Sequence, residues 1–132
     1  MQLLYQYNFI GRLQHSLRLS SHQLAQLNQL TEAVAPTTLC PQQRDSEQLQ
    51  ILANVFSKYF VSEIQLYTSE LSRYQQQLWP LLQQLYQHTE LNTPLTLRFE
   101  QTYIDMRTEL SRHVKWWQAL NSQCPVKLTA QQ

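Results

Sequence analysis

The chain contains a single glycine, Gly11, in 132 residues, and this scarcity restricts its possible folds more than any other feature. Turns that join the strands of a sheet commonly need glycine, because few other residues adopt their backbone conformations. Only five prolines accompany it, so the chain lacks the turn residues of a many-stranded sheet. Leucine and glutamine, which favour helices, are abundant instead. The composition therefore predicts an all-α protein.

The charge balance limits the kinds of partner that the chain can attract. Its formal net charge is +1, and charged residues make up only 14% of it. Such a chain has no overall field to draw in nucleic acid or an acidic membrane, so binding of that kind needs a local basic patch. Hydrophobic residues make up 42%, enough for one core. We therefore expect residues 1–132 to form a single helical-bundle domain.

Apolar residues recur at helical spacing from residue 3 to about residue 34. Four of them lie seven positions apart, as in a heptad repeat: Leu3, Ile10, Leu17 and Leu24. The pattern is weak at Gly11 and near Ser20, which has the spacing of a cap for a second helix. The segment is therefore expected to form either one helix, kinked near Ser20, or two collinear helices.

A second helical pattern follows a proline-containing loop at residues 35–45, with Asp45 or Ser46 as its N-cap. Its apolar residues are spaced by three or four positions, which is the period of a helix. Pro80 lies inside the pattern and is expected to kink or divide the helix. The predicted core row is Leu52, Phe56, Phe60, Ile64, Tyr67, Leu71, Tyr74, Leu78, Leu81 and Leu85.

The third pattern begins after a second loop at residues 88–94 and continues to about residue 120. Pro125 stops it, and we expect residues 123–132 to form a loose tail. Three long helices joined by two loops predict an elongated, antiparallel up-down-up bundle. The predicted core residues of the third helix include Phe99, Tyr103, Met106, Leu110, Trp117 and Leu120.

The two cysteines, Cys40 and Cys124, are expected at the same end of this bundle. A disulfide between them would close a loop of about 85 residues, which is worth about 4–5 kcal/mol on the chain-entropy model. Lying at one end does not by itself bring two Cα atoms within reach of a disulfide, and cytoplasmic conditions keep thiols reduced. We therefore favour two free thiols, with a disulfide as the alternative.

The N-terminal stretch MQLLYQYNFIGRLQHS lacks the basic start and the continuous apolar run of a signal peptide. No segment approaches the roughly 18 consecutive apolar residues of a membrane-spanning helix. The sequence therefore predicts a cytoplasmic protein without membrane contact.

The histidines, His15, His22, His88 and His113, are scattered, and no two have the spacing of metal ligands on one helix. Glu109 lies one turn before His113, but two ligands do not make a zinc or di-iron site. We expect this pair to form a hydrogen bond on the helix surface. The sequence predicts no metal and no other cofactor.

Arg107 and His113 have five residues between them. The spacing resembles the R-x4–6-H signature of HEPN ribonucleases, small all-helical proteins that place such a motif on a late helix. The resemblance implies a ribonuclease site built from these two side chains. Thr108 departs from the Asn or Asp that more typically follows the arginine in that family. Six helical steps of about 100° also leave the two side chains about 120° apart, which favours separate structural roles.

The same helix carries a candidate contact surface for a partner. Arg112, Lys115 and Trp116 form a small basic and aromatic spot on its flank, since acidic neighbours neutralise the rest of the basic stripe. Leu97 and Ile104 lie seven residues apart on the side away from the core. Aligned apolar residues beside a tryptophan are typical of a contact surface.

These features favour a non-catalytic helical interaction protein, an adaptor or a small subunit of a larger assembly, that binds a protein partner or itself. The first alternative is a nucleic-acid-binding subunit of a nucleoprotein complex, which would use the basic part of the third helix. The second is an HEPN-like ribonuclease. In the favoured interpretation no residue is catalytic, and an enzyme is not expected.

Overall fold

The computed structural model describes residues 2–41, 46–87 and 92–124, with side chains from residue 8 onward except at 86 and 92–96. Helix α1 spans Gln2–Glu32, α2 spans Pro36–Leu39 and α3 spans Glu47–Val55. A π-helical segment, η2, spans Phe56–Ile64, and α4 (Gln65–Tyr86) and α5 (Asn92–Gln123) follow it. Every regular element in these ranges is a helix, so the all-α prediction is confirmed.

Helix α1 is continuous, which decides between the two arrangements left open by the sequence. The helix runs through Gly11 and Ser20 without a break. A Cβ atom at Gly11 would meet nothing within 4 Å, so no packing contact requires glycine there. Ser20 caps no second helix and is instead buried, on the same side as Leu17 and Leu24.

Helices α3 and α4 are joined through η2 without interruption, and we call residues 47–86 the middle rod. Ser46 caps its first turn, as predicted: its hydroxyl oxygen accepts from the Leu49 N–H at 3.1 Å, and its O–H donates to the Leu39 carbonyl. Helix α4 continues through Pro80 to Tyr86, so the proline does not divide it. The predicted N-cap alternative Asp45 lies outside the described residues.

The π-helical segment changes which residues of α4 face the core. In η2 the Gln65 N–H donates to the Phe60 carbonyl, five residues back rather than four. A wider turn adds a residue, so the buried face of α4 is shifted by one position from a continuous α-helical row. The predicted core row is therefore wrong at Tyr67, Leu81 and Leu85, which are exposed. Thr68 and Leu82 are buried beside Tyr67 and Leu81, and Ser72 and Gln75 are buried as well, while Leu71 is buried as predicted.

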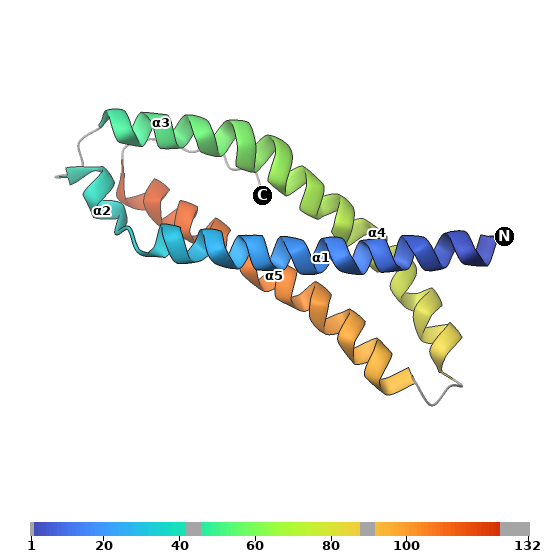
Figure 1. The fold of residues 1–132 in the computed structure, drawn as a ribbon. Helices are drawn as coiled ribbons and strands as arrows, with labels where there is room; N and C mark the ends of the chain where they lie inside the picture. The colour runs from blue at the N-terminus through green and yellow to red at the C-terminus, as the bar shows by residue number, and fades with distance from the viewer. Residues whose placement is uncertain (1, 42–45, 88–91, 125–132) are drawn as a thin grey trace.

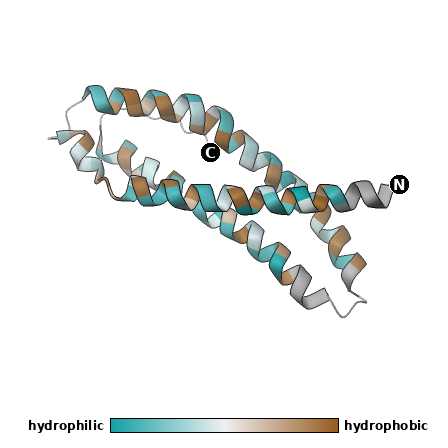
Figure 2. Cartoon of the chain, in the orientation of Figure 1, coloured by the Kyte–Doolittle hydropathy of each residue, from teal (hydrophilic) through white to brown (hydrophobic). Residues whose placement is uncertain are grey.

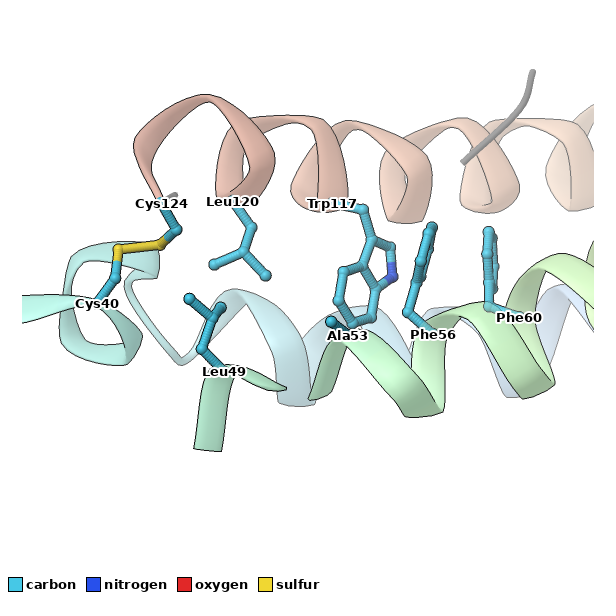
Figure 3. Close-up of a cluster of buried hydrophobic side chains, with 8 residues drawn as sticks. All are labelled: Cys40, Leu49, Ala53, Phe56, Phe60, Trp117, Leu120 and Cys124. Carbon is cyan, nitrogen blue, oxygen red and sulfur yellow. A yellow bond between two sulfur atoms is a disulfide. The ribbon is translucent and has the colours of Figure 1, made fainter. Parts of the chain in front are cut away.

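The core consists of two clusters of buried side chains. The larger one joins the middle rod to the end of α5, where the Phe56 and Trp117 rings lie 4.1 Å apart between centroids (Figure 3). The smaller one joins all three long segments through Leu13, Leu17, Leu71 and Met106. Hydrophobic and hydrophilic residues alternate along each long helix, as expected where only one stripe is buried (Figure 2).

The long segments do not stay together along their whole length (Figure 1). Helix α1 packs along α5, while α4 and α5 form a hairpin whose tip lies well away from the N-terminus of α1. We call this part, residues 78–86 and 92–104, the distal hairpin. The fold differs from the predicted scheme of three helices by the short helix α2 within the first predicted loop, and by this divergence.

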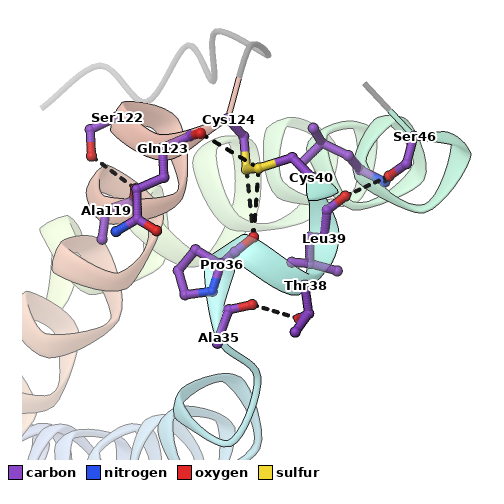
Figure 4. The surroundings of a disulfide bond; sticks show 11 residues. Ala35, Pro36, Thr38, Leu39, Cys40, Ser46, Ala119, Ser122, Gln123 and Cys124 are labelled. Atoms are coloured by element: carbon purple, nitrogen blue, oxygen red, sulfur yellow. Dashed lines mark hydrogen bonds between the residues drawn. A yellow bond between two sulfur atoms is a disulfide. The ribbon is translucent and has the colours of Figure 1, made fainter. Parts of the chain in front are cut away.

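Helix α2 also explains why the preference for free thiols was wrong. It turns the chain so that Cys40 reaches the end of α5, and Cys40 and Cys124 form a disulfide with their Cα atoms 5.7 Å apart (Figure 4). Both residues are buried in the larger core cluster. Their sulfur atoms lie 3.6–3.7 Å from the Pro36 carbonyl oxygen. Bridged sulfurs carry no hydrogen, so these are packing contacts.

Candidate interaction surface

Leu97 and Ile104 lie on the outer side of α5, as predicted from their spacing. Their exposed fractions are 60% and 45%, whereas Phe99 and Met106, two residues further along in each case, are buried. The placement follows from helical geometry, because a residue two positions away points about 200° around the axis. The outward position of both residues is therefore confirmed, and their contact with a partner remains a prediction.

A shallow groove runs along this outer side and has a basic character. Neither Arg107 nor Lys115 forms an ion pair within the described part of the chain. The groove thus places two cations that have no acidic partner in the described ranges beside the apolar side chain of Ile104. Its lining residues are Tyr103, Ile104, Arg107, Thr108, Ser111, Arg112 and Lys115.

Arg112 belongs to the groove, but its charge is already paired. The guanidinium Nε donates to Glu32 Oε1 of α1 at 2.6 Å, and Nη1 lies 3.2 Å from Glu109 Oε2. The hydrogen bond from Arg112 lowers the pKa of the Glu32 carboxyl, and the same bond raises the pKa of the arginine. The free positive charge of the groove therefore comes from Arg107 and Lys115.

Trp116 is only partly available for contact. Its ring packs at 5.0 Å and nearly perpendicular to Trp117, and the side chain is half-buried against the larger core cluster. Its indole N–H is buried and finds no acceptor among the described residues. Of the five predicted contact residues, Leu97, Ile104 and Lys115 are thus exposed. Arg112 and Trp116 instead make contacts within the protein.

A buried polar network beneath this surface was missed by sequence reasoning. Asn28 of α1 is fully buried, and its amide N–H groups donate to the Glu109 carbonyl at 2.9 Å and to Glu109 Oε2 at 2.8 Å. Its amide oxygen lies 3.0 Å from His113 Nδ1. The predicted surface hydrogen bond between Glu109 and His113 is therefore wrong, since both residues instead bind the same asparagine of the neighbouring helix.

The tautomer of His113 follows from its partners. The Trp117 indole, which can only donate, donates to His113 Nε2 at 2.8 Å. Nδ1 must then carry the ring hydrogen and donate to the Asn28 amide oxygen. The Phe60 ring packs at 4.7 Å from the imidazole, and burial lowers the pKa of His113 to about 4. The imidazole is neutral and serves to join α1, α5 and the middle rod.

The structure does not bring Arg107 and His113 together as a catalytic pair. His113 is 2% exposed, and both of its ring nitrogens are bonded inside the core. Arg107 lies on the surface of α5. A histidine in this position cannot reach a substrate that binds at Arg107, so the geometry argues against the ribonuclease alternative.

A second exposed apolar stretch lies on α4, at the distal hairpin. Phe9 of α1 packs edge-on against Tyr74, with ring centroids 5.1 Å apart. Leu81 lies one heptad beyond Tyr74 on the same line of α4, yet 59% of it is exposed, and 49% of Leu85 is exposed. The adjacent Leu82 is buried instead, in agreement with the shifted register of α4, and α1, which reaches Tyr74 through Phe9, diverges from α4 along the distal hairpin (Figure 1).

The described residues contain no group of three or more metal-ligating side chains. Within the same ranges, no helix is long and apolar enough to cross a membrane. His88, one of the four histidines considered from the sequence, lies outside the described residues.

The sequence model of one protein family, described as "Protein of unknown function (DUF3080)", matches residues 1–128. The chain belongs to this family. No curated protein and no solved structure matches it. Membership in DUF3080 brings no activity with it, so a function for this chain has to be argued from its surface.

Proposed function

We propose that this member of DUF3080 is a non-catalytic helical interaction protein, an adaptor or a small subunit of a larger assembly, that binds a protein partner or a second copy of itself. The observation that carries the proposal is the exposure of four large apolar side chains on the distal hairpin, each 45–60% accessible: Leu81, Leu85, Leu97 and Ile104.

Energetics support contact at this place. Covering the exposed part of each of these side chains would contribute roughly 1–2 kcal/mol at about 25 cal/mol per Å² of apolar area. Three long segments share the smaller core cluster, whereas the described part of the distal hairpin consists of α4 and α5, from which α1 has diverged (Figure 1). A further helix packed there would complete the arrangement found elsewhere in the molecule.

The partner's chemistry follows from the groove on α5. Arg107 and Lys115 have no acidic partner among the described residues, and they flank the line through Ile104. A partner helix with apolar residues and nearby carboxylates would match this surface in both shape and charge. Leu97, Ile104 and Lys115 are then the contact residues, while Arg112 and Trp116 support the surface from below.

The scaffold for this function is, in our proposal, the up-down-up bundle expected from the sequence, formed by α1, the middle rod and α5 as one domain of residues 1–132. The tail predicted at 123–132 lies outside the described residues beyond Cys124. The disulfide holds one end of this bundle together, and the distal hairpin at the other end would bind the partner.

Sedimentation velocity tests whether the chain binds a second copy of itself. We expect the wild-type chain to form a dimer or higher assembly, and a Leu97→Ser/Ile104→Ser variant to sediment as a monomer with an unchanged circular dichroism spectrum. Leu30→Ser is the matched control, because Leu30 is an even more exposed apolar residue on α1. Equal dissociation in both variants would show that surface hydrophobicity in general, and not this face, drives association.

The nucleic-acid alternative depends on the same two cations, Arg107 and Lys115. Two phosphate contacts would give weak binding that weakens further with added salt. Fluorescence anisotropy with single- and double-stranded oligonucleotides at low salt tests it, with Arg107→Ala/Lys115→Ala as the variant. Unchanged anisotropy at any protein concentration would remove this alternative.

The disulfide bears on the cellular location. Disulfides persist in oxidising compartments and are rare in the cytoplasm, where thiols are kept reduced. The cytoplasmic location expected from the sequence would leave Cys40 and Cys124 as thiols, so we propose an oxidising compartment instead. Trapping of free thiols with a mass tag in intact cells tests this, and two tagged cysteines would restore the cytoplasmic location.

A further inference from the structure

A cavity of about 280 Å³ lies between α1 and the middle rod, away from the distal hairpin. Its apolar lining comes from Leu24 and Leu27 of α1 and from Ile64 of η2, and its polar rim includes Glu63 and Tyr67. At about 30 Å³ for each water-sized group, it has room for roughly nine non-hydrogen atoms. That is the volume of a small organic molecule.

The cavity lies where the π-helical segment changes into α4. Three polar residues also line it: Ser20, Gln23 and Thr68. The Thr68 hydroxyl is turned back onto its own helix, where it lies 2.9 Å from the Ile64 carbonyl oxygen and 3.1 Å from that of Gln65. Because this hydroxyl is bonded within α4, it leaves the lining of the cavity largely apolar at this position.

The rim of the cavity carries negative charge. Glu63 is exposed and forms no ion pair within the described ranges of the chain. Tyr67, one turn further on, is 48% exposed and offers an aromatic face and a hydroxyl at the same rim. A carboxylate next to an aromatic ring attracts an ammonium group through charge and through the ring quadrupole.

We propose that this cavity binds a small cationic amphiphile, an ammonium group on an apolar body of about six to eight carbon atoms. The body would pack against Leu24, Leu27 and Ile64, and the ammonium would lie at the rim between Glu63 and Tyr67. The size of the cavity favours a short apolar body over a long acyl chain, and the carboxylate disfavours anionic amphiphiles. This site is independent of the proposed protein contact, since none of its residues belongs to the distal hairpin or to the groove on α5.

Titration of the disulfide-bonded chain by nuclear magnetic resonance tests the proposal, with n-hexylammonium, n-hexanol and n-hexanoate as probes. We expect saturable shifts of cavity residues with hexylammonium at a Kd on the order of 1 mM, the range for so small a ligand. Hexanol should bind about tenfold more weakly, and hexanoate should not saturate.

Two variants separate the charge from the cavity. Glu63→Gln should remove the tenfold preference for hexylammonium, whereas the matched control Glu70→Gln, on the exposed surface of α4, should keep it. Leu27→Trp should fill the cavity and abolish binding of hexylammonium and hexanol alike, with an unchanged circular dichroism spectrum. Equal affinity for hexylammonium and hexanol, or binding that survives Leu27→Trp in the folded protein, would overturn the proposal.

Discussion

Acidification should destabilise this protein through one buried side chain, His113. In the folded chain the imidazole is neutral, because Nδ1 donates to Asn28 and Nε2 accepts from the Trp117 indole. A proton on Nε2 would place two donors face to face in the core. Burial accordingly lowers the pKa of His113 from 6.5 to about 4.

The direction and size of the effect follow from this difference. Between these two pKa values the unfolded chain binds a proton that the folded chain does not bind, so falling pH favours unfolding. The stabilisation by neutral His113 is therefore complete above pH 6.5 and is lost as the pH falls toward 4. At pH 4.5 the loss amounts to about 2.5 kcal/mol, a large part of the stability of a typical domain.

The assay is chemical denaturation followed by tryptophan fluorescence at a series of pH values. His113→Gln keeps an acceptor for the Trp117 indole but cannot take up a proton, so its free energy of unfolding should fall much less between pH 7 and pH 4.5. His22→Gln, at an exposed position of α1, should behave like the wild type. If wild type and His113→Gln lose the same stability over this range, the buried network has been misinterpreted.

Three further predictions concern the disulfide, the smaller core cluster and the ion pair between Arg112 and Glu32. Cys40→Ser removes the disulfide between residues 84 positions apart and should lower the free energy of unfolding by up to about 4–5 kcal/mol. If the wild type has the same denaturation midpoint with and without reductant, the disulfide does not stabilise the fold in this way. Met106→Ala empties a fully buried position in the smaller core cluster and should cost about 2–5 kcal/mol, whereas Leu30→Ala on the surface of α1 should change stability by less than about 0.5 kcal/mol. Arg112→Ala removes the hydrogen bond that lowers the pKa of Glu32, so the pKa of that carboxyl should rise in a magnetic resonance titration; an unchanged value would show that the pair does not persist in solution.

Local patterns in the sequence predicted the helices well, and they predicted the outward side of α5. The reason is that α5 keeps α-helical geometry over its whole length, so the spacing of Leu97, Ile104, Met106 and Trp117 translates directly into faces. The same reasoning failed for part of α4: Leu71 is buried as predicted, whereas Tyr67, Leu81 and Leu85 are exposed. Its register depends on the π-helical segment before it, and the apolar spacing of the middle rod is equally compatible with an unbroken α-helix.

Contacts between segments that are distant in the sequence could also not be predicted from it. Asn28 lies four residues after Leu24, and this spacing indicates a polar side chain at a core position. The spacing does not identify its partner, because His113 is 85 positions away. The disulfide depends on α2, a four-residue helix in a segment that contains two prolines and has the composition of a loop. Both pairings are set by tertiary packing, on which local propensity carries little information.

Site-specific photo-crosslinking in the native cell tests the central claim, that the distal hairpin is a protein contact surface. A photoreactive phenylalanine analogue replaces Ile104 or Leu81 in turn, and Leu30 on α1 as the control. We expect one discrete crosslinked species of the same mass from Ile104 and from Leu81, whether a dimer of this chain or a heteromeric complex, and none from Leu30. The absence of any adduct at both distal positions, or an identical adduct at Leu30, would contradict the account.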